Sequence, residues 1–304
     1  MSDVHVAVLV LTFRRATELK RCLDSLGEQL AVDATWEVVV IDNDDVPSAA
    51  LVVGDASRRF PVPVRYVHHS VPGLSSARNR ALDESVGFDV VAFIDDDEVA
   101  DVHWLRQLLE ALDKTNAAVA QGHVSSVLED GGPLWASESG VFDRVMHAPL
   151  QRIPTAASNN VAIRVAALDG ARFADRFNFT GGEDTEFFLR LKKAGRVLVS
   201  APEAIVTEVV PTSRQTYPWL FRRAYRTAAG WTVIDREANP RLVRIPIRLA
   251  SAARDISIAL VLLAAATRPS RRTHVLPFAV RQAAKGLGTL AGLFGAVHRE
   301  YRRV

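Results

Sequence analysis

The chain has 304 residues, of which 48% are hydrophobic and 24% charged, a balance that excludes intrinsic disorder. Its single cysteine, Cys22, excludes an intramolecular disulfide, and its spacing from neighbouring leucines predicts a small buried hydrophobe. The net charge of +2 hides an asymmetry: residues 241–304 hold 12 of the 37 Lys and Arg residues but only two of the 35 acids, Asp255 and Glu300. An acidic body with a basic tail predicts an anionic partner, either a membrane or a nucleic acid.

Strands alternate with helices through the first 114 residues. Continuous apolar runs predict buried strands at residues 4–11, 36–41, 64–68 and 90–94. Helical periodicity predicts helices at residues 17–26, 75–85 and 101–114. The alternation predicts an α/β fold with a mostly parallel sheet, in which the ligand site lies beyond the carboxyl ends of the strands. Polar side chains follow the predicted strands there: Thr12, Arg14, Asp42 and Asp95–Asp97.

The region from residue 118 to 208 is less regular. We expect a strand at residues 119–127 and short strands at 196–199 and 204–208. Between them, a helix at residues 185–193 follows Gly181 and Gly182 and ends at Gly195.

The tail contains two charge-free stretches, residues 256–267 and 286–297, on either side of a basic turn at 268–272. Each is shorter than the roughly 20 apolar residues that span a bilayer. Two such helices bordered by Arg and Lys predict a hairpin that lies in a membrane interface; the alternative is a helical pair packed on the catalytic domain. We therefore expect a catalytic domain at residues 1–225 and a basic helical tail at 226–304.

The N-terminus enters an apolar strand at once, with no basic region or cleavage site before it, so no secretory signal is predicted. A cytoplasmic protein, peripherally associated with the inner face of the plasma membrane, is the expectation. The tail has few aromatic residues, which favours lipid over stacked bases and predicts no nucleic-acid partner.

Four consecutive acids, Asp95 to Glu98, directly follow a predicted buried strand. Like charges this close repel and raise one another's pKa unless a cation neutralises them. Oxygen ligands suit Mg²⁺ or Mn²⁺, and such a metal would hold a diphosphate. The alternative is a solvated acidic turn that caps the following helix.

Two further segments carry candidate chemistry. Glu183 and Asp184 follow the two glycines, and a carboxylate there is a candidate general base, although acids at a helix start also satisfy free N–H groups. Arg78 is a natural partner for a diphosphate, although it could equally lie on an exposed helix face.

Together, the segments at residues 8–15, 39–44, 77–79, 93–97 and 182–184 occur in the order and spacing of family 2 glycosyltransferases. The chain resembles that family over residues 4–225. In detail, residues 93–98, 181–190 and 219–223 are similar to bacterial exopolysaccharide enzymes of the succinoglycan glucosyltransferase type. The resemblance implies a GT-A fold with a C-terminal helical extension. It also implies inverting transfer of a sugar from a nucleotide-sugar, expected to be a UDP-sugar, to a hydroxyl of a glycan or polyisoprenoid-linked acceptor.

The resemblance also implies roles for the residues that bind the donor. Asp42 would contact the uracil or ribose, Thr12 and Arg14 would line the same pocket, and Arg78 would lie near the base or diphosphate.

For catalysis, the resemblance implies that Asp97 is the main ligand of a Mg²⁺ or Mn²⁺ ion and that Asp95 faces both ribose and metal. Asp184 would be the catalytic base, with Glu183 beside it at the substrate.

The chain departs from the family pattern at two places. Asn43 occupies a position where many relatives have a second Asp, and Glu208 lies where many have a histidine. Either Glu208 would ligate metal or Arg214 would take the diphosphate.

Two other classes of function are weaker candidates. A nucleotidyltransferase would carry a loop rich in Gly and Lys after the first strand, whereas residues 12–15 contain neither. A non-enzymatic binding protein would use the basic tail on nucleic acid.

Overall fold

A computed structural model of the chain describes residues 4–238 and 240–295. The chain divides into two compact units. The sheet unit comprises Met1–Ser125, Arg144–Phe179 and Glu183–Glu208, and the helical unit comprises Ser126–Asp143, Thr180–Gly182 and Val209–Val304. The domain boundary at residue 225 stays a prediction.

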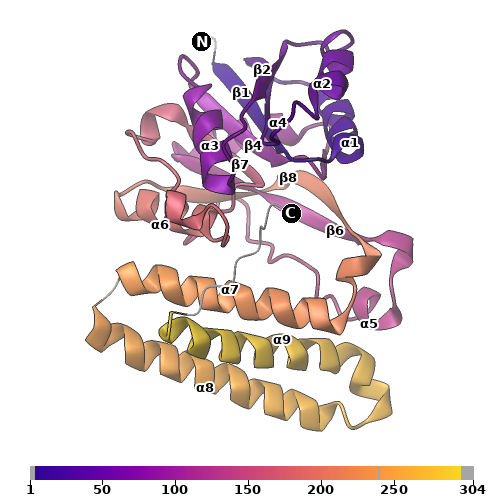
Figure 1. The fold of residues 1–304 in the computed structure, drawn as a ribbon, viewed down its shortest axis with the longest axis vertical. Helices are drawn as coiled ribbons and strands as arrows, with labels where there is room; N and C mark the ends of the chain where they lie inside the picture. The colour runs from indigo at the N-terminus through magenta and orange to yellow at the C-terminus, as the bar shows by residue number, and fades with distance from the viewer. Residues whose placement is uncertain (1–3, 239, 296–304) are drawn as a thin grey trace. The chain divides into compact units, whose positions relative to one another are not determined.

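A mixed sheet with the strand order β3-β2-β1-β4-β7-β6-β8-β5 forms the centre of the fold (Figure 1). Its parallel half consists of β1 (His5–Thr12), β2 (Thr35–Asp42), β3 (Val64–His68) and β4 (Val90–Asp95). The other half consists of β5 (Glu98–Ala100), β6 (Val119–Leu128), β7 (Asn160–Arg164) and β8 (Leu198–Val210). There the pairs β4–β7, β6–β7 and β5–β8 are antiparallel. The predicted α/β architecture is thus confirmed, with the parallel pairs confined to one half of the sheet.

Both faces of the sheet are covered, which explains the continuous apolar runs. Five helices flank it: α1 (Ala16–Gly27), α2 (Ala50–Ser57), α3 (Leu74–Asp83), α4 (Trp104–Thr115) and α6 (Glu183–Lys193). Successive residues of β1 alternate between two cores: Val8 packs in the core that includes Leu19 and Trp104, whereas Leu9 packs in the core with Phe187. Cys22 is fully buried in the first core, as predicted.

Two features of the antiparallel half differ from the sequence prediction. Strands β5 and β7 were not predicted, and the two short strands at 196–199 and 204–208 are one strand, β8. The chain stays extended across the predicted gap because Ser200 pairs with a neighbouring segment. Leu150 N donates to Ser200 O at 2.8 Å, and Ser200 N donates to Gln151 O at 2.9 Å.

A buried amide links this half of the sheet to α4. Asn160 Oδ1 accepts from Trp104 Nε1 at 2.8 Å, while Asn160 Nδ2 donates to the carbonyls of His123 and Ala204 at 3.0 and 2.9 Å. A Cβ at Gly122 would overlap the amide of Asn160, so glycine leaves room for this link. The Asn160 side chain thereby links β6, β7 and β8 next to the end of β4, where the acidic segment 95–98 begins.

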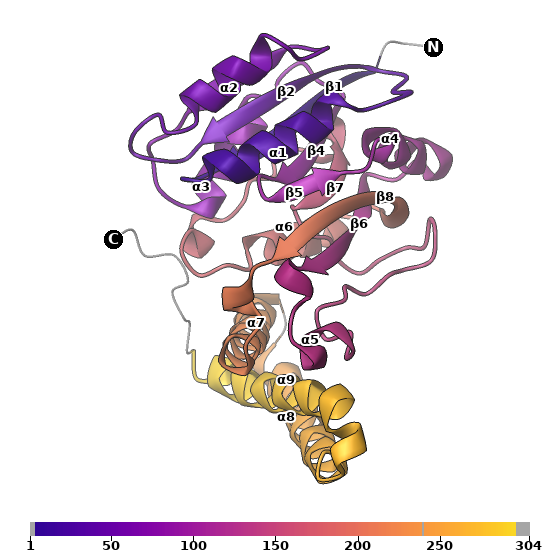
Figure 2. The ribbon, with the colours of Figure 1, turned by 90° about the vertical axis from the view of Figure 1, so that its right-hand side faces the viewer.

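The helical unit is built from α7 (Tyr217–Ala238), α8 (Arg241–Ala265) and α9 (Pro269–Leu293), with the short α5 (Leu134–Ser137). Figures 1 and 2 show α9 lying between α7 and α8. Glycines allow the close approach: a Cβ at Gly288 would overlap the Tyr225 carbonyl, and one at Gly292 would lie 2.7 Å from Ala229 O. On the other side, a Cβ at Gly286 would lie 3.1 Å from Ala252 O.

The C-terminal helical extension is confirmed, with one change at its centre. The predicted basic turn is mostly helical: Arg268 precedes α9 and Pro269 begins it, as proline commonly does at a helix start. The end of the second charge-free stretch, with Glu300 and the rest of residues 296–304, lies outside the described residues. Among the described helices, none combines the length and apolar character needed to span a bilayer.

Candidate active site

The register of the parallel strands brings their polar ends to one edge of the sheet. Thr12 pairs with Asp42, Leu11 pairs with Asp95, and Asp42 pairs with His68. The ends of four strands, β1 to β4, therefore lie side by side where an open α/β sheet binds its ligand.

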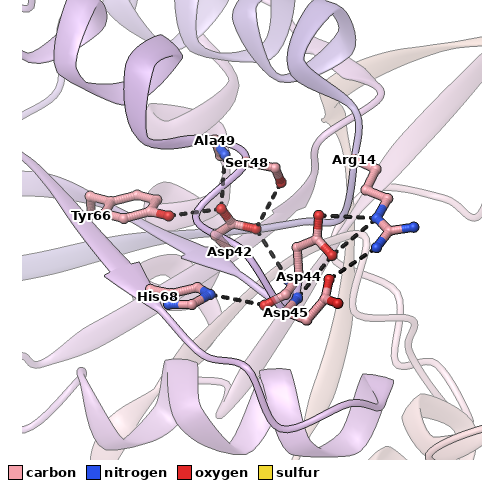
Figure 3. Close-up of polar contacts among 8 residues, drawn as sticks. All are labelled: Arg14, Asp42, Asp44, Asp45, Ser48, Ala49, Tyr66 and His68. Carbon is pink, nitrogen blue, oxygen red and sulfur yellow. Dashed lines mark hydrogen bonds and ion pairs between the residues drawn. The ribbon is translucent and has the colours of Figure 1, made fainter. Parts of the chain in front are cut away.

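Asp42 organises the loop that follows β2 (Figure 3). Its buried carboxylate accepts from Ala49 N and Tyr66 Oη at 2.8 Å each through Oδ2, and from Asp44 N at 3.2 Å and Ser48 Oγ at 3.4 Å through Oδ1. Burial and the nearby Asp42 carboxylate raise the pKa of Tyr66, which keeps its phenol a donor. Asp42 thus fixes the loop that follows β2, and its contact with the donor base stays a prediction.

Arg14 lies at the rim of the same loop, in the left-handed region with φ of 55°. Its Nε lies 3.0 Å from both carboxylate oxygens of Asp44, and its Nη2 lies 2.9 Å from Asp45 Oδ1 (Figure 3). Burial alone would raise the pKa of Asp44, but the hydrogen bonds from Arg14 and Asp45 hold it well below its usual range. With its side chain half exposed, Arg14 remains accessible to a ligand.

The departure at Asn43 has a structural reason. The amide Nδ2 donates to the carbonyls of His69 at 2.8 Å and Val71 at 2.6 Å, while Oδ1 accepts from Gly73 N at 3.2 Å. An ionised Asp could accept from Gly73 but could not donate to either carbonyl. Asn43 therefore ties the β2 loop to the segment that leads into α3.

The acidic segment alternates between inward and outward carboxylates. Asp96 and Glu98 are buried, whereas Asp95 and Asp97 are partly exposed. Thr12 Oγ1 donates to Asp96 Oδ2 at 2.7 Å, and Glu98 Oε2 accepts from Asp95 N at 3.2 Å. Thr12 thus fixes an acid in this structure, and Asp95 and Asp97 are the carboxylates that can reach a ligand.

Burial and crowding raise the pKa of Asp95, Asp96 and Glu98. Burial raises the pKa of Asp95 to about 7, with Arg78 opposing the shift and neighbouring carboxylates adding to it. Burial also raises the pKa of Asp96 to about 6, although Arg15 and Thr12 stabilise its charged form. Such concentrated negative charge favours a cation at this strand end.

Arg15 supplies part of that positive charge, a role the sequence did not indicate. Its Nη1 lies 3.1 Å from Asp96 Oδ1 and 2.8 Å from Asp97 Oδ2. Across residues 4–238 and 240–295, no three His, Cys, Asp or Glu side chains are grouped to ligate one metal ion. Asp95 and Asp97 still fit a Mg²⁺ or Mn²⁺ ion, because such ions bind through one or two carboxylates and complete their shell with water and substrate phosphates.

Glu208 lies across from Glu98 in the register of β5 and β8, and its charge adds to the raised pKa of Asp95. It also forms an ion pair with Arg144, with 3.0 Å between Oε2 and Nη2. Arg214 belongs to the helical unit, in the 3₁₀ turn Thr212–Arg214.

A buried ion pair joins α3 to α6. Arg78 Nη1 contacts Glu183 Oε1, both side chains are buried, and the guanidinium carbon lies 5.7 Å from the centre of the Phe173 ring. Burial raises the pKa of Glu183 while Arg78 opposes the shift. Asn178 fastens the start of α3, because its Oδ1 accepts from Ser76 N at 2.8 Å. The predicted diphosphate partner is therefore a buried cation between two helices, and its contact with the donor stays a prediction.

Asp184 follows Glu183 in the first turn of α6 and is partly exposed. Its Oδ1 accepts from Thr185 N at 2.6 Å. Asp95 and Asp184 both act on Arg78, since the charge of each raises the pKa of that guanidinium, while burial lowers it. The predicted base therefore lies in the helix turn that the Arg78–Glu183 ion pair anchors.

Comparison with known sequences identifies the family. The chain matches the model of Glycosyl transferase family 2 over residues 7–170 and that of Glycosyl transferase family group 2 over residues 90–287. It is 37% identical to the succinoglycan biosynthesis protein ExoM of Rhizobium meliloti over 228 residues. This alignment covers 74% of this chain and 73% of ExoM.

Solved structures share the fold. The mannosyltransferase PcManGT from Pyrobaculum calidifontis, in complex with GDP-Man and Mn²⁺, aligns with a TM-score of 0.64 and 18% identity over 97% of this chain and 88% of its own. S. aureus TarS 1–349 in complex with UDP aligns with a TM-score of 0.54 and 16% identity over 96% and 92%. With its sequence match and its GT-A sheet in agreement, the chain belongs to glycosyl transferase family 2 and is a glycosyltransferase of the exopolysaccharide type.

Proposed function

We propose that this glycosyltransferase moves a sugar from a nucleotide-sugar, expected to be a UDP-sugar, to a hydroxyl of a glycan or lipid-linked acceptor, with inversion. The observation that carries the proposal is the buried ion pair between Arg78 and Glu183, because it fixes the first turn of α6, where Asp184 lies. The charge of Asp95 also raises the pKa of Arg78. A donor held at the strand-end acids would then lie near a carboxylate suited to act as base.

Asp95 and Asp97 would hold a Mg²⁺ or Mn²⁺ ion together with the donor diphosphate. When bound, the metal supplies Lewis-acid stabilisation of the leaving nucleoside diphosphate. Mn²⁺ accompanies GDP-Man in PcManGT, a protein of the same fold. Arg15, now paired with Asp97, is the side chain that would have to yield to the cation.

Asp184 would take the proton from the acceptor hydroxyl. The hydroxyl oxygen then bonds to the anomeric carbon as the bond between that carbon and the diphosphate oxygen breaks. The electron pair of the broken bond leaves on the nucleoside diphosphate. Because one displacement inverts the anomeric centre, we expect no glycosyl-enzyme intermediate. Thr12, Arg14 and Asp42 would form the wall that receives the nucleoside, with Glu183 at the substrate side of the base.

Binding of the donor tests this proposal. We would measure the thermal shift with UDP, GDP, dTDP and their sugars, with and without Mn²⁺, in the wild type and in Asp97→Ala. One nucleotide should raise the midpoint in the presence of Mn²⁺, and Asp97→Ala should lose the shift while the surface control Asp24→Ala keeps it. A folded wild type that responds to none of these nucleotides would refute the donor site.

We also propose that the basic tail holds the enzyme on the cytoplasmic face of the plasma membrane, where a polyisoprenoid-linked acceptor would lie. The support is the excess of Arg and Lys over acids in residues 241–304. Binding to anionic vesicles should weaken as salt rises. Equal retention on zwitterionic vesicles at all salt concentrations would contradict the electrostatic part.

A further inference from the structure

Helix α8 exposes large apolar side chains on the side opposite α9. The residues that face α9 include Ala252, Asp255 and Ala259, which are all buried. The opposite side, here called the outer face, consists of Leu242, Val243, Ile247, Leu260 and Val261, which are 90%, 54%, 59%, 63% and 69% exposed.

This distribution is the reverse of an ordinary surface helix, which directs its polar side toward water. The pairs at residues 242–243 and 260–261 are 18 residues apart, which is five turns, so both lie on the same side of α8 about 27 Å apart. Apolar exposure this extended marks an interaction surface in folded proteins.

The charges around the outer face are positive. Arg241 begins α8, while Arg268, Arg271 and Arg272 follow its end, and all four are exposed. Between residues 241 and 295 the sequence contains one acid, Asp255, which is buried beside Arg254 at 2.9 Å. An apolar strip with cationic ends matches acyl chains bordered by anionic headgroups.

A second copy of the chain fits this face less well. Two copies related by a two-fold axis would bring the cationic ends of their α8 helices together. Arg241 of one copy would lie against Arg241 of the other, or against its Arg268, Arg271 and Arg272, and like charges repel there. Anionic headgroups would instead pair with these exposed guanidinium groups.

We propose that α8 lies in the plane of an anionic bilayer with its outer face toward the acyl chains. This rests on the proposed membrane association and assigns it to one helix. Most of the second charge-free stretch, as far as it is described, packs against α7 and α8, whereas its Leu287 and Phe294 are 45% and 90% exposed.

The experiment is flotation of the full chain with vesicles of phosphatidylcholine and phosphatidylglycerol. Two variants, Leu242→Gln/Ile247→Gln and Leu260→Gln/Val261→Gln, should each lower the partition coefficient by about tenfold or more. The matched control Leu51→Gln/Val86→Gln replaces side chains that are 85% and 83% exposed in the sheet unit and should leave partition unchanged. Denaturant unfolding of the same preparations reports on folding, and nucleoside diphosphate binding is measured separately.

Several outcomes would overturn the proposal. If both α8 variants float as much as the wild type, another surface contacts the lipid. A wild-type dimer that fails to float and that either α8 variant converts to a monomer would assign the outer face to a second copy. A wild-type monomer that does not float would refute the membrane role. If flotation follows the prediction while no nucleotide binds, the donor proposal fails and the α8 assignment holds.

Discussion

In the sheet unit, Asp42, Asp96 and Glu98 lie buried with hydrogen-bond donors around them. In the helical unit, many buried positions are glycine or alanine, while large apolar side chains of α8 are exposed. Buried carboxylates are costly unless they are paired, so their presence marks where charge is used. An extended strip of exposed apolar side chains is unusual in water and marks an interaction surface. The comparison teaches that each unit carries its unfavourable groups where we expect a ligand: a nucleotide-sugar with its metal in one and a bilayer in the other.

The largest effect is expected from Asp184→Asn, which tests the proposed catalytic base in the sheet unit. Because the amide cannot accept the acceptor proton, transfer should fall by about 10²–10⁴-fold. Donor binding by thermal shift and vesicle flotation should both persist, since neither depends on this proton transfer. Asp113→Asn, which changes an exposed acid paired with Arg164, serves as the control. Transfer by Asp184→Asn at the wild-type rate would exclude this residue as the base.

The parallel half of the sheet and the position of its acids could be predicted because both are local. Apolar runs gave β1 to β4 within one residue at most ends, and Asp95 and Asp97 follow directly on β4. The same strand rule placed Thr12 and Asp42 together before any contact was known.

Other features depend on residues far apart in the chain. Arg15 meets Asp96 and Asp97 across 81 and 82 positions, and the Arg78–Glu183 pair spans 105. Strand β7 has only five residues, with Asn160 buried by partners on three other elements. No local pattern encodes such pairings, so the sequence could name candidate acids but not the cations that hold them.

Arg78→Met tests how much the buried ion pair with Glu183 contributes to the stability of the sheet unit. Removing the guanidinium leaves Glu183 buried without its partner, which should cost about 3–5 kcal/mol in the free energy of unfolding. Denaturant unfolding measures this. The double variant Arg78→Met/Glu183→Leu should recover part of the loss, because it leaves no unpaired charge.

The matched control is Arg58→Met, which removes one member of an exposed ion pair with Asp55 and should change little. If Arg78→Met and Arg58→Met cost the same, burial of the first pair would have no energetic weight.

Gly288→Val tests close packing between helices in the helical unit. A Cβ there would overlap the carbonyl of Tyr225, so α9 must move away from α7. Overpacking of this kind should cost about 1–3 kcal/mol in the free energy of unfolding. Nucleotide binding in the sheet unit should be retained. Unchanged stability would show that α7 and α9 do not require close backbone approach.

The smallest expected effect comes from Gly230→Ala, at a glycine of α7 where a Cβ would meet nothing within 4 Å. Alanine restricts the unfolded chain and suits a helix, so this variant should gain about 0.5–1 kcal/mol in the free energy of unfolding. Denaturant unfolding beside Gly288→Val separates the two roles of glycine in one helical unit. If Gly230→Ala were destabilising, a contact on that side of α7 would be required, and the surface around Gly230 would become a further candidate interface.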